Sequence, residues 1–344
     1  MRRFAAPLAL AAALAAAAEA SAVEPKQAAR AALARLADEA ERGERTALAG
    51  KNGWLFLVQE LRHLGAGRFW GADAARASRA SNREWVDPLP AILDFRDQLR
   101  SVGVDLLLVP VPPRAAVVPA ELPELDASPA SRLDDADAEF YALLRSEGVD
   151  VLDLQPEFAA AGKSRPAVCR TDTHWSGDGI AIAAGRIAER ARKLPWYAGV
   201  AKQRFVSESR DIEIRGDLLR MLGDLALPPE RLTLRFVTRE GDDPGVSVAP
   251  DPKSPLLLLS DSHGLVFSAG GDLYARGAGL ADQLALELGI AVDLVAVRGA
   301  PSNAGRMQLA RRKDGLAGKK LVVWVFGARY FTDVQGWAKV PVVR

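Results

Sequence analysis

The stretch PLLLLSDSH, residues 255–263, is an apolar run that ends abruptly in polar residues. A continuous apolar run of this length is typical of a strand buried on both faces of a parallel sheet. The run ends at Ser260, so Ser262 is expected at the turn between this strand and a following helix. Active sites of open parallel sheets lie beyond the carboxyl ends of strands. Ser262 is therefore a candidate functional residue.

Further apolar runs alternate with helical patterns on both sides of this stretch. Strands are predicted at 104–109, 149–154, 290–297 and 321–326, and helices at 90–103, 129–147, 176–193, 280–288 and 303–311. This alternation predicts an α/β fold with a mainly parallel sheet flanked by helices. Residues 195–250 are less regular and carry several charges, so we expect an insertion or a cap over the sheet.

The first 49 residues divide into two parts. Residues 1–22 combine an Arg2-Arg3 start, an apolar run of about 15 residues and an A-x-A exit, which predicts a cleavable signal peptide and a periplasmic protein. The alternative is an uncleaved anchor, although a membrane-spanning helix needs about 20 residues. Residues 23–49 are rich in Ala, Arg and Glu and predict an exposed or loosely docked helical segment. We expect residues 50–344 to form one catalytic domain.

The composition argues against several classes of function. Charged residues make up 26% and the net charge is +1, so nothing argues for binding to nucleic acid or to a strongly anionic membrane. Cys169 is the single cysteine, so no internal disulfide can form; it is expected to be a small buried residue, with a reactive thiol as the alternative. The three histidines are far apart and no metal or phosphate-loop motif is present, so we expect no metal and no cofactor.

The segment CRTDTHW, residues 169–175, holds a candidate base for Ser262. Asp172 and His174 are two residues apart, so in an extended segment both side chains lean to one face. A carboxylate there fixes the imidazole tautomer, and the imidazole can deprotonate a serine. His263 is the alternative base, although its side chain is expected to point away from Ser262. Asp172 and Ser262 could instead merely cap a turn and a helix, and His63 is expected to be structural.

Five segments in order resemble the alginate O-acetyltransferase family (AlgJ/AlgX type) of SGNH-like proteins. They are KNGWLF at 51–56, VPVPPR at 109–114 with VPAELP at 118–123, DTHW at 172–175, SDS at 260–262, and VVWVF at 322–326 followed by Arg329 and Tyr330. One departure is Ser260, which stands where the family carries the glycine of its G-D-S motif.

The resemblance implies an SGNH-like, flavodoxin-like fold with a permuted motif order, in which the Asp/His pair precedes the serine. It implies a triad of Ser262, His174 and Asp172. It further implies acetyl transfer through an acetyl-serine intermediate to hydroxyls of an exopolysaccharide (alginate or similar) in the periplasm. The polysaccharide would be the acceptor, and a membrane-bound protein would deliver the acetyl group because acetyl-CoA is cytoplasmic.

Supporting residues and competing functions stay open. Gly299 and Asn303 follow a strand end where SGNH proteins often place oxyanion donors, or they form a plain turn and helix cap. Trp175 could stack on a sugar or fill the core, and Arg329 and Tyr330 are further candidates for substrate contact. The same triad would also serve a polysaccharide acetyl esterase. A third possibility is a non-catalytic carbohydrate-binding component of an exopolysaccharide assembly complex.

Overall fold

The computed structural model describes residues 26–123, 125, 132–162, 164–223, 227–243, 245–299 and 302–343. The predicted signal peptide, residues 1–22, lies outside the described residues. Within the described part of the chain, no helix is long and apolar enough to cross a membrane.

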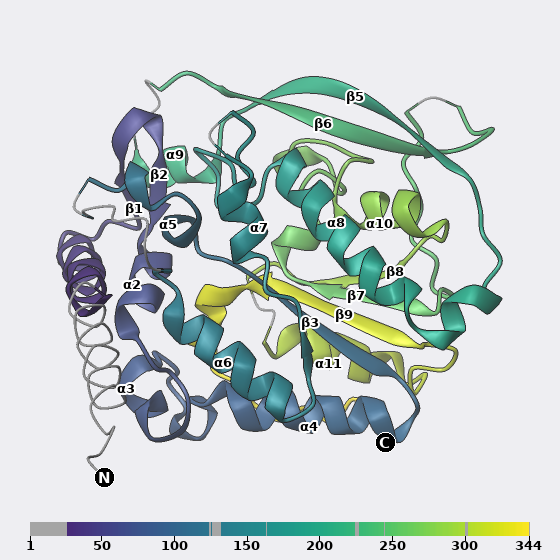
Figure 1. Cartoon of the computed structure of the whole chain (residues 1–344), viewed down its shortest axis with the longest axis horizontal. Coiled ribbons are helices and arrows are strands. Elements are labelled where there is room, and N and C mark those ends of the chain that lie inside the picture. Colours follow the sequence, from purple (N-terminus) through teal and green to yellow (C-terminus); the bar gives the residue numbers. More distant parts are fainter. Residues whose placement is uncertain are drawn as a thin grey trace, which may run out of the picture.

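A parallel sheet of five strands forms the centre of the described structure (Figure 1). The strand order is β4-β3-β9-β7-β8, with bounds Asp105–Val111 (β3), Asp150–Val151 (β4), Leu256–Ser260 (β7), Asp293–Ala296 (β8) and Leu321–Gly327 (β9). Strand β9 is buried along its whole length and pairs with β3 on one side and β7 on the other. The sheet confirms the mainly parallel α/β fold that the apolar runs predict.

Helices cover both faces of the sheet. On one face lie α8 (Gly177–Arg192) and α10 (Leu280–Leu288), and on the other lie α4 (Pro88–Ser101), α6 (Asp135–Ser146) and α11 (Ala304–Arg312). Successive strand residues point to opposite faces, so Leu256 and Leu258 enter one core while Leu257 and Leu259 enter the other. Shorter elements complete the chain: β1 (Ala47–Ala49), β2 (Leu55–Leu57), α2 (Val58–Ala66), α3 (Ala74–Ala77), α5 (Arg114–Val117) and α7 (Gln155–Ala160).

Local chemistry sets where the main helices begin. The Asp87 carboxylate accepts the Leu89 N–H at 3.0 Å, and Pro88 occupies the first helical position of α4, where its missing N–H does no harm. The Ser176 hydroxyl accepts the Gly179 N–H at 3.2 Å at the start of α8. Capping by Ser176 fixes the point where the chain leaves the predicted Asp/His segment and enters a helix.

The N-terminal helix, residues 26–42, is docked rather than exposed or loose, so that expectation is wrong. Its buried residues are Leu33, Leu36, Ala37 and Ala40, which repeat at helical spacing and join the core on the α8 side of the sheet. Gly65 of α2 lies directly against Ala34, and Arg30 forms an ion pair with Asp135 at 2.8 Å.

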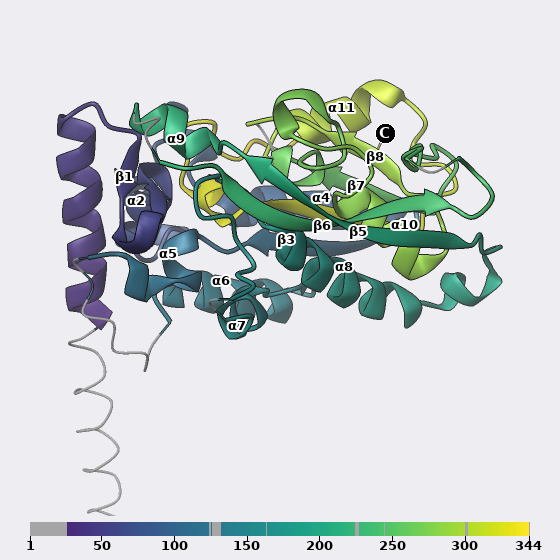
Figure 2. The same ribbon diagram turned by 90° about the horizontal axis from the view of Figure 1, so that it is seen from above.

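Residues 195–250 contain an ordered β-ribbon in place of the irregular segment that their composition suggests. Strands β5 (Phe205–Ile214) and β6 (Glu230–Arg239) pair antiparallel over ten residues, with α9 (Asp217–Leu222) between them. The ribbon runs along the outside of the molecule, and β6 packs on α8 and α10 (Figures 1 and 2). Leu232, Leu234 and Val237 of β6 are buried, whereas β5 is exposed along most of its length. The end of the ribbon that carries Ile214, α9 and Glu230 is called its base below. This base contacts the Asp172–His174 segment.

The helix expected to begin near Ser262 is replaced by a single 3₁₀ turn, Ser262–Gly264. Asp261 caps this turn by accepting the His263 N–H at 2.8 Å. Phe267, at φ 60°, and Gly270, at φ 73°, then turn the chain away from a helical path. The segment between Ser262 and α10 is therefore a compact loop.

The docking of the N-terminal helix can be tested at Gly65. A Cβ added there would lie 2.6 Å from the backbone nitrogen of Ala34, so Gly65→Ala should force the two helices apart. We expect it to lower the free energy of unfolding by about 1–3 kcal/mol, measured by urea denaturation. Gly185→Ala on α8 is the matched control, because a Cβ there meets nothing within 4 Å. It should raise that free energy by roughly 0.5–1 kcal/mol; equal stability of both variants would contradict the docking.

Candidate active site

A tight hairpin, not an extended segment, carries Asp172 and His174. An antiparallel bridge between Val168 and Trp175 closes the hairpin, and the Cys169 N–H donates to the His174 carbonyl at 3.1 Å. Within the turn the Asp172 carboxylate accepts the His174 N–H at 3.1 Å, which is the local bond of an Asx turn. The two side chains meet because of this turn.

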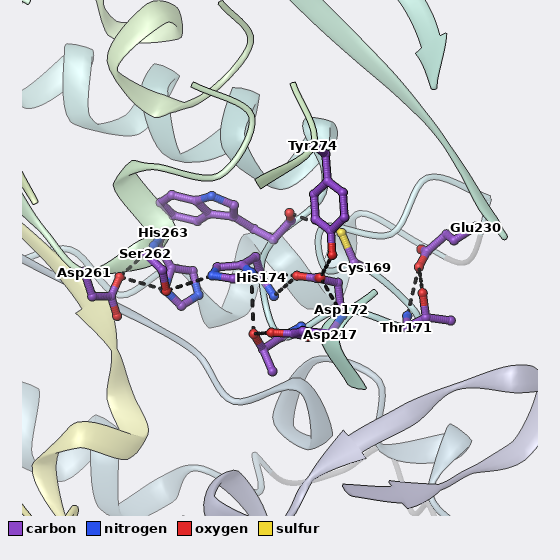
Figure 3. A network of polar contacts seen from close by, with 12 residues as sticks. Cys169, Thr171, Asp172, His174, Asp217, Glu230, Asp261, Ser262, His263 and Tyr274 are labelled. Atoms are coloured by element: carbon purple, nitrogen blue, oxygen red, sulfur yellow. Dashed lines mark hydrogen bonds and ion pairs between the residues drawn. The ribbon is translucent and has the colours of Figure 1, made fainter. Parts of the chain in front are cut away.

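Three side chains form a continuous hydrogen-bonded line (Figure 3). His174 Nε2 lies 2.8 Å from Ser262 Oγ, and His174 Nδ1 lies 2.6 Å from Asp172 Oδ1. Ser262 is partly exposed, whereas His174 and Asp172 are buried. This is the arrangement of a nucleophile, its base and the carboxylate that orients the base.

The surroundings of the Asp172–His174 pair lower the pKa of the carboxyl group and raise the pKa of the imidazole. Burial alone would raise the pKa of Asp172, but the adjacent imidazole and the hydrogen bonds to the carboxylate outweigh burial, so the net shift is downward. Burial would lower the pKa of His174, but the Asp172 charge and its hydrogen bond outweigh that effect, so the pKa is raised above its usual value of 6.5. The pair therefore favours an ionised carboxylate beside a basic imidazole.

Two further carboxylates hold the hairpin from the base of the ribbon. Glu230, at the start of β6, accepts the Arg170 N–H at 2.7 Å, the Thr171 N–H at 2.8 Å and the Thr171 hydroxyl at 2.9 Å. Asp217, at the start of α9, accepts the Thr173 N–H at 2.8 Å and the Thr173 hydroxyl at 2.6 Å. These bonds fix the backbone on both sides of the Asp172 carboxylate.

The close approach of the ribbon depends on Gly216. A Cβ at this position would lie 1.9 Å from the Thr171 carbonyl oxygen. The absence of a side chain lets the Asp217 N–H reach Asp172 Oδ2 at 2.9 Å. The ribbon thus contributes a donor to the triad itself.

A second Asp–His pair, Asp261 and His263, flanks Ser262. His263 Nδ1 lies 2.9 Å from Asp261 Oδ1, and its ring packs edge-on against Trp175 and His174 with centroids 5.3 Å and 5.0 Å apart. Asp261 Oδ2 accepts the Gly327 N–H at 3.1 Å, which ties the end of β7 to the end of β9. No hydrogen bond joins His263 to Ser262 among the described residues, so the geometry favours His174 as the base.

The two histidines differ in their electrostatic surroundings as well. Burial lowers the pKa of His263. The charge of Asp261 and its hydrogen bond oppose this, but burial, together with the nearby His174 and Arg329, outweighs them. Burial would raise the pKa of Asp261, but His263 and the bonds to it bring that pKa down to about 2. His263 is therefore a neutral ring hydrogen-bonded to the ionised Asp261 carboxylate. This pair is suited to supporting the 3₁₀ turn Ser262–Gly264.

Buried charges link the hairpin to the sheet. Arg114, the first residue of α5, donates to the carbonyls of Leu55 (2.7 Å) and Asp172. Glu60 accepts the Arg114 N–H at 3.0 Å and lies 3.5 Å from the Arg329 guanidinium. Glu60 of α2 thereby connects the segment after β3 with the segment after β9.

The other predicted site residues lie as follows. Trp175 is fully buried in the core, so it fills space there and is not available to stack on a sugar. Arg329 is buried and pairs with Glu60, and its guanidinium lies 3.4 Å from the Tyr330 hydroxyl. Neither Arg329 nor Tyr330 contacts Ser262 through a hydrogen bond within the described residues.

Asn303 and Gly299 hold the C-terminal segment. The Asn303 amide donates to the carbonyls of Gln335 (3.3 Å) and Gly336 (3.2 Å), and its oxygen accepts the Ala338 N–H at 3.0 Å. The Gly299 carbonyl accepts the Gln335 side-chain amide. The structure does not bring these two residues to the triad. Ser262 begins the 3₁₀ turn Ser262–Gly264, and a backbone N–H at such a position is the kind of donor that an oxyanion site uses.

Cys169 and His63 have structural surroundings. The Cys169 thiol is fully buried and donates to the Trp175 carbonyl at 3.3 Å, and burial raises its pKa well above the ordinary value. His63 is buried between Asp137 (2.9 Å) and Thr332 (3.1 Å), away from the triad. Neither side chain is placed to react with a substrate at Ser262.

One group of side chains has the spacing of metal ligands. The candidate ligand atoms of Asp172, His174 and Asp217 lie within 4.8 Å of one another. The atoms of this group already bond each other or donors nearby, such as the Thr173 hydroxyl on Asp217. Hydrogen bonding within the triad and the hairpin therefore accounts for the cluster.

A cavity of about 570 Å³ lies beside the hairpin but does not contain the triad. Its lining includes Trp54, Arg165, Arg170 and Glu230. Ser262 follows β7 at the carboxyl edge of the sheet and is partly exposed.

Several residues of the network escaped prediction from the sequence. Glu230 and Asp217 lie 59 and 44 residues from their partners Thr171 and Thr173, and no local pattern marks them. Tyr274 also escaped prediction, although its hydroxyl donates to Asp172. A signal was present for the pair of Asp261 and His263, because they repeat the D-x-H spacing of the first pair.

Residues 47–328 match the family model described as an SGNH hydrolase-like domain, acetyltransferase AlgX. The chain belongs to this family. It is 28% identical over 231 residues to the probable alginate O-acetylase AlgJ of Pseudomonas putida, covering 64% of this chain and 55% of that protein. It is 27% identical over 303 residues to the probable alginate O-acetylase AlgJ of Pseudomonas aeruginosa, covering 84% and 71%. The chain thus spans about half the length of the Pseudomonas putida relative.

Solved structures of the AlgX family share the fold. The O-acetyltransferase domain of Pseudomonas putida AlgJ superposes with a TM-score of 0.62 at 24% identity, over 84% of this chain and 92% of that one. Pseudomonas aeruginosa AlgX gives a TM-score of 0.61 at 17% identity, over 82% and 61%. Family and fold confirm the resemblance and the SGNH-like architecture expected from the sequence.

The raised pKa of His174 predicts a particular pH dependence. The base must be neutral to take the serine proton, so protonation at low pH blocks the reaction of Ser262 with an activated acetyl ester. Because the pKa is raised, the rate should climb with pH along a limb whose midpoint lies above 6.5. A pH–rate profile with 4-nitrophenyl acetate measures this midpoint.

Asp172→Asn is the control for that profile. Loss of the charge should move the midpoint to lower pH, and loss of the correct tautomer should reduce the plateau rate by about 10³- to 10⁴-fold. A wild-type midpoint below 6.5, or an unchanged midpoint in the variant, would show that another group titrates.

Proposed function

We propose that the chain is an O-acetyltransferase that carries the acetyl group on Ser262. The observation that supports this most strongly is the line of hydrogen bonds from Ser262 Oγ to His174 Nε2 (2.8 Å) and from His174 Nδ1 to Asp172 (2.6 Å). A serine hydroxyl is a poor nucleophile unless a base removes its proton. His174 is in position to do so, and Asp172 orients it and stabilises the imidazolium that forms.

The first half-reaction loads the serine. Ser262 Oγ attacks the carbonyl carbon of an acetyl donor as its proton passes to His174 Nε2. The Ser262 N–H donates to the oxyanion of the tetrahedral intermediate. The bond to the donor then breaks, the donor's leaving group takes the proton from His174, and acetyl-Ser262 remains.

The second half-reaction transfers the acetyl group to an acceptor hydroxyl. His174 takes the hydroxyl proton, the acceptor oxygen attacks the acetyl carbon, and Ser262 leaves with the proton returned by His174. A partly exposed serine at the carboxyl edge of the sheet suits an acceptor as large as a polymer. The names of the AlgJ relatives, probable alginate O-acetylases, support an exopolysaccharide such as alginate as that acceptor.

The reaction is proposed to take place in the periplasm. The predicted signal peptide of residues 1–22 supports export. Acetyl-CoA is cytoplasmic, so a membrane-bound protein is the proposed carrier of acetyl groups to Ser262.

An acetyl esterase is the second candidate. The partial exposure of Ser262 favours it, because water that reaches acetyl-Ser262 would hydrolyse it. A purely carbohydrate-binding role has less support, since it would leave the bonded Ser262–His174–Asp172 line without a purpose.

Intact-mass analysis tests the proposal. Wild type, Ser262→Ala and His174→Ala are exposed to an activated acetyl ester, with and without acetylatable oligosaccharides such as mannuronate oligomers. Wild type should gain one acetyl group at Ser262 and pass it to the sugar, while both variants fail to load.

Each other outcome selects a different function. Transfer of the acetyl group only to water, whatever sugar is offered, moves the esterase ahead. If wild type and both variants behave alike, the assignment of Ser262, His174 and Asp172 as a catalytic triad is wrong. Carbohydrate binding would then be the function to test next.

A further inference from the structure

The loop between Ser262 and α10 contains an unusual turn at Tyr274. This residue has φ 74° and ψ −64°, and the Ala275 N–H donates to the Leu273 carbonyl at 3.0 Å across it. These values define the positive-φ form of the γ-turn, which is rare and strained for a residue with a side chain. A bulky tyrosine at such a position calls for an explanation.

The surrounding backbone holds the turn in place. The Phe267 N–H also donates to the Leu273 carbonyl at 3.0 Å, and the Gly270 N–H donates to the Ala275 carbonyl at 2.8 Å. The Val237 N–H donates to the Gly277 carbonyl at 2.7 Å, which fastens the loop to strand β6 of the ribbon. A strained conformation persists only where neighbours fix it in this way.

The Tyr274 hydroxyl reaches the catalytic carboxylate (Figure 3). It donates to Asp172 Oδ2, which also accepts the Asp217 N–H at 2.9 Å, while Oδ1 accepts both bonds from His174. Among the described residues, Tyr274 and His174 supply the side-chain donors to this carboxylate. The hydroxyl therefore opposes rotation of the carboxylate away from the imidazole.

The path of the chain adds to this role. Tyr274 follows Ser262 by 12 residues on the same loop, whereas Asp172 precedes Ser262 by 90. The bond thus joins the segment of the nucleophile to the segment of the base. The tyrosine ring packs against buried Phe267, with centroids 5.8 Å apart, so its own direction is fixed.

We propose that Tyr274 is a positioning residue of the triad, and that its strained turn is retained because it aims the hydroxyl at Asp172 Oδ2. The catalytic readout of this inference rests on the proposed function, but the contact itself does not. Tyr274 acts through Asp172 and His174, and it does not touch the substrate in this role.

The test is a double-mutant cycle. Tyr274→Phe removes the hydroxyl and keeps the ring, and Tyr197→Phe is the matched control, because its hydroxyl donates to the Leu288 carbonyl at 3.0 Å, outside the triad. Acetylation of Ser262 by 4-nitrophenyl acetate should slow about tenfold in Tyr274→Phe and stay unchanged in Tyr197→Phe.

The second arm of the cycle repeats Tyr274→Phe in an Asp172→Ala background. If the hydroxyl acts through Asp172, the tenfold loss should disappear there. The same loss in both backgrounds would assign Tyr274 a general structural role and overturn the proposal.

A spectroscopic readout separates this inference from the proposed function. The proton on His174 Nδ1, bonded to Asp172, should give a low-field NMR signal that moves in Tyr274→Phe and not in Tyr197→Phe. The signal can be followed even if no acetyl group reaches any sugar. An unmoved signal would overturn the positioning role, whereas a moved signal without transfer would leave it standing and reject only the transferase.

Discussion

The buried carboxylate of Asp172 must have hydrogen-bond donors on both oxygens, because an ionised group removed from water is otherwise strongly destabilised. Its own hairpin supplies the two bonds from His174, the base of the ribbon supplies the Asp217 N–H, and the loop after the nucleophile supplies the Tyr274 hydroxyl. Three separate parts of the fold therefore converge on one side chain. The hairpin, the ribbon and the strained turn are best understood as the means of meeting that requirement.

Two D-x-H triplets adopt the same local geometry and still differ in role. In each, the aspartate accepts the backbone N–H and the Nδ1 of a histidine two residues later. The ring of His174 continues to the serine, whereas the ring of His263 packs on Trp175 beside Arg329. The two imidazole rings lie 5.0 Å apart, so a positive charge on one opposes protonation of the other. One pair is thus left to accept the proton and the other to brace the turn.

The sequence predicted those features that depend on local patterns. Apolar runs located the strands because a doubly covered sheet needs them, and short motifs located Ser262, His174 and Asp172. The N-terminal helix was misjudged since its apolar residues, mostly alanines, give a weak stripe that is still wide enough to dock. The expected helix after Ser262 failed because Phe267 adopts a positive φ that only the tertiary structure enforces.

Contacts made across long separations were beyond prediction. Glu230, Asp217 and Tyr274 are ordinary residues in sequence, and their roles arise only when the ribbon and the loop close on the hairpin. The need for glycine at position 216 was also not predictable from the sequence, although a methyl group there would collide with Thr171. The local patterns of a single sequence do not indicate which distant residues will be in contact.

The separation of these partners along the chain also bears on how the protein acquires its reactivity. Ser262 and His174 are 88 residues apart, and Tyr274 and Asp172 are 102 apart. Contacts of this kind form slowly, since the entropy of closing large loops must be overcome before they gain stability. During folding, Ser262 remains an ordinary alcohol until the ribbon and both halves of the sheet have assembled around the hairpin. Reactivity is thereby delayed until the chain has reached its native state.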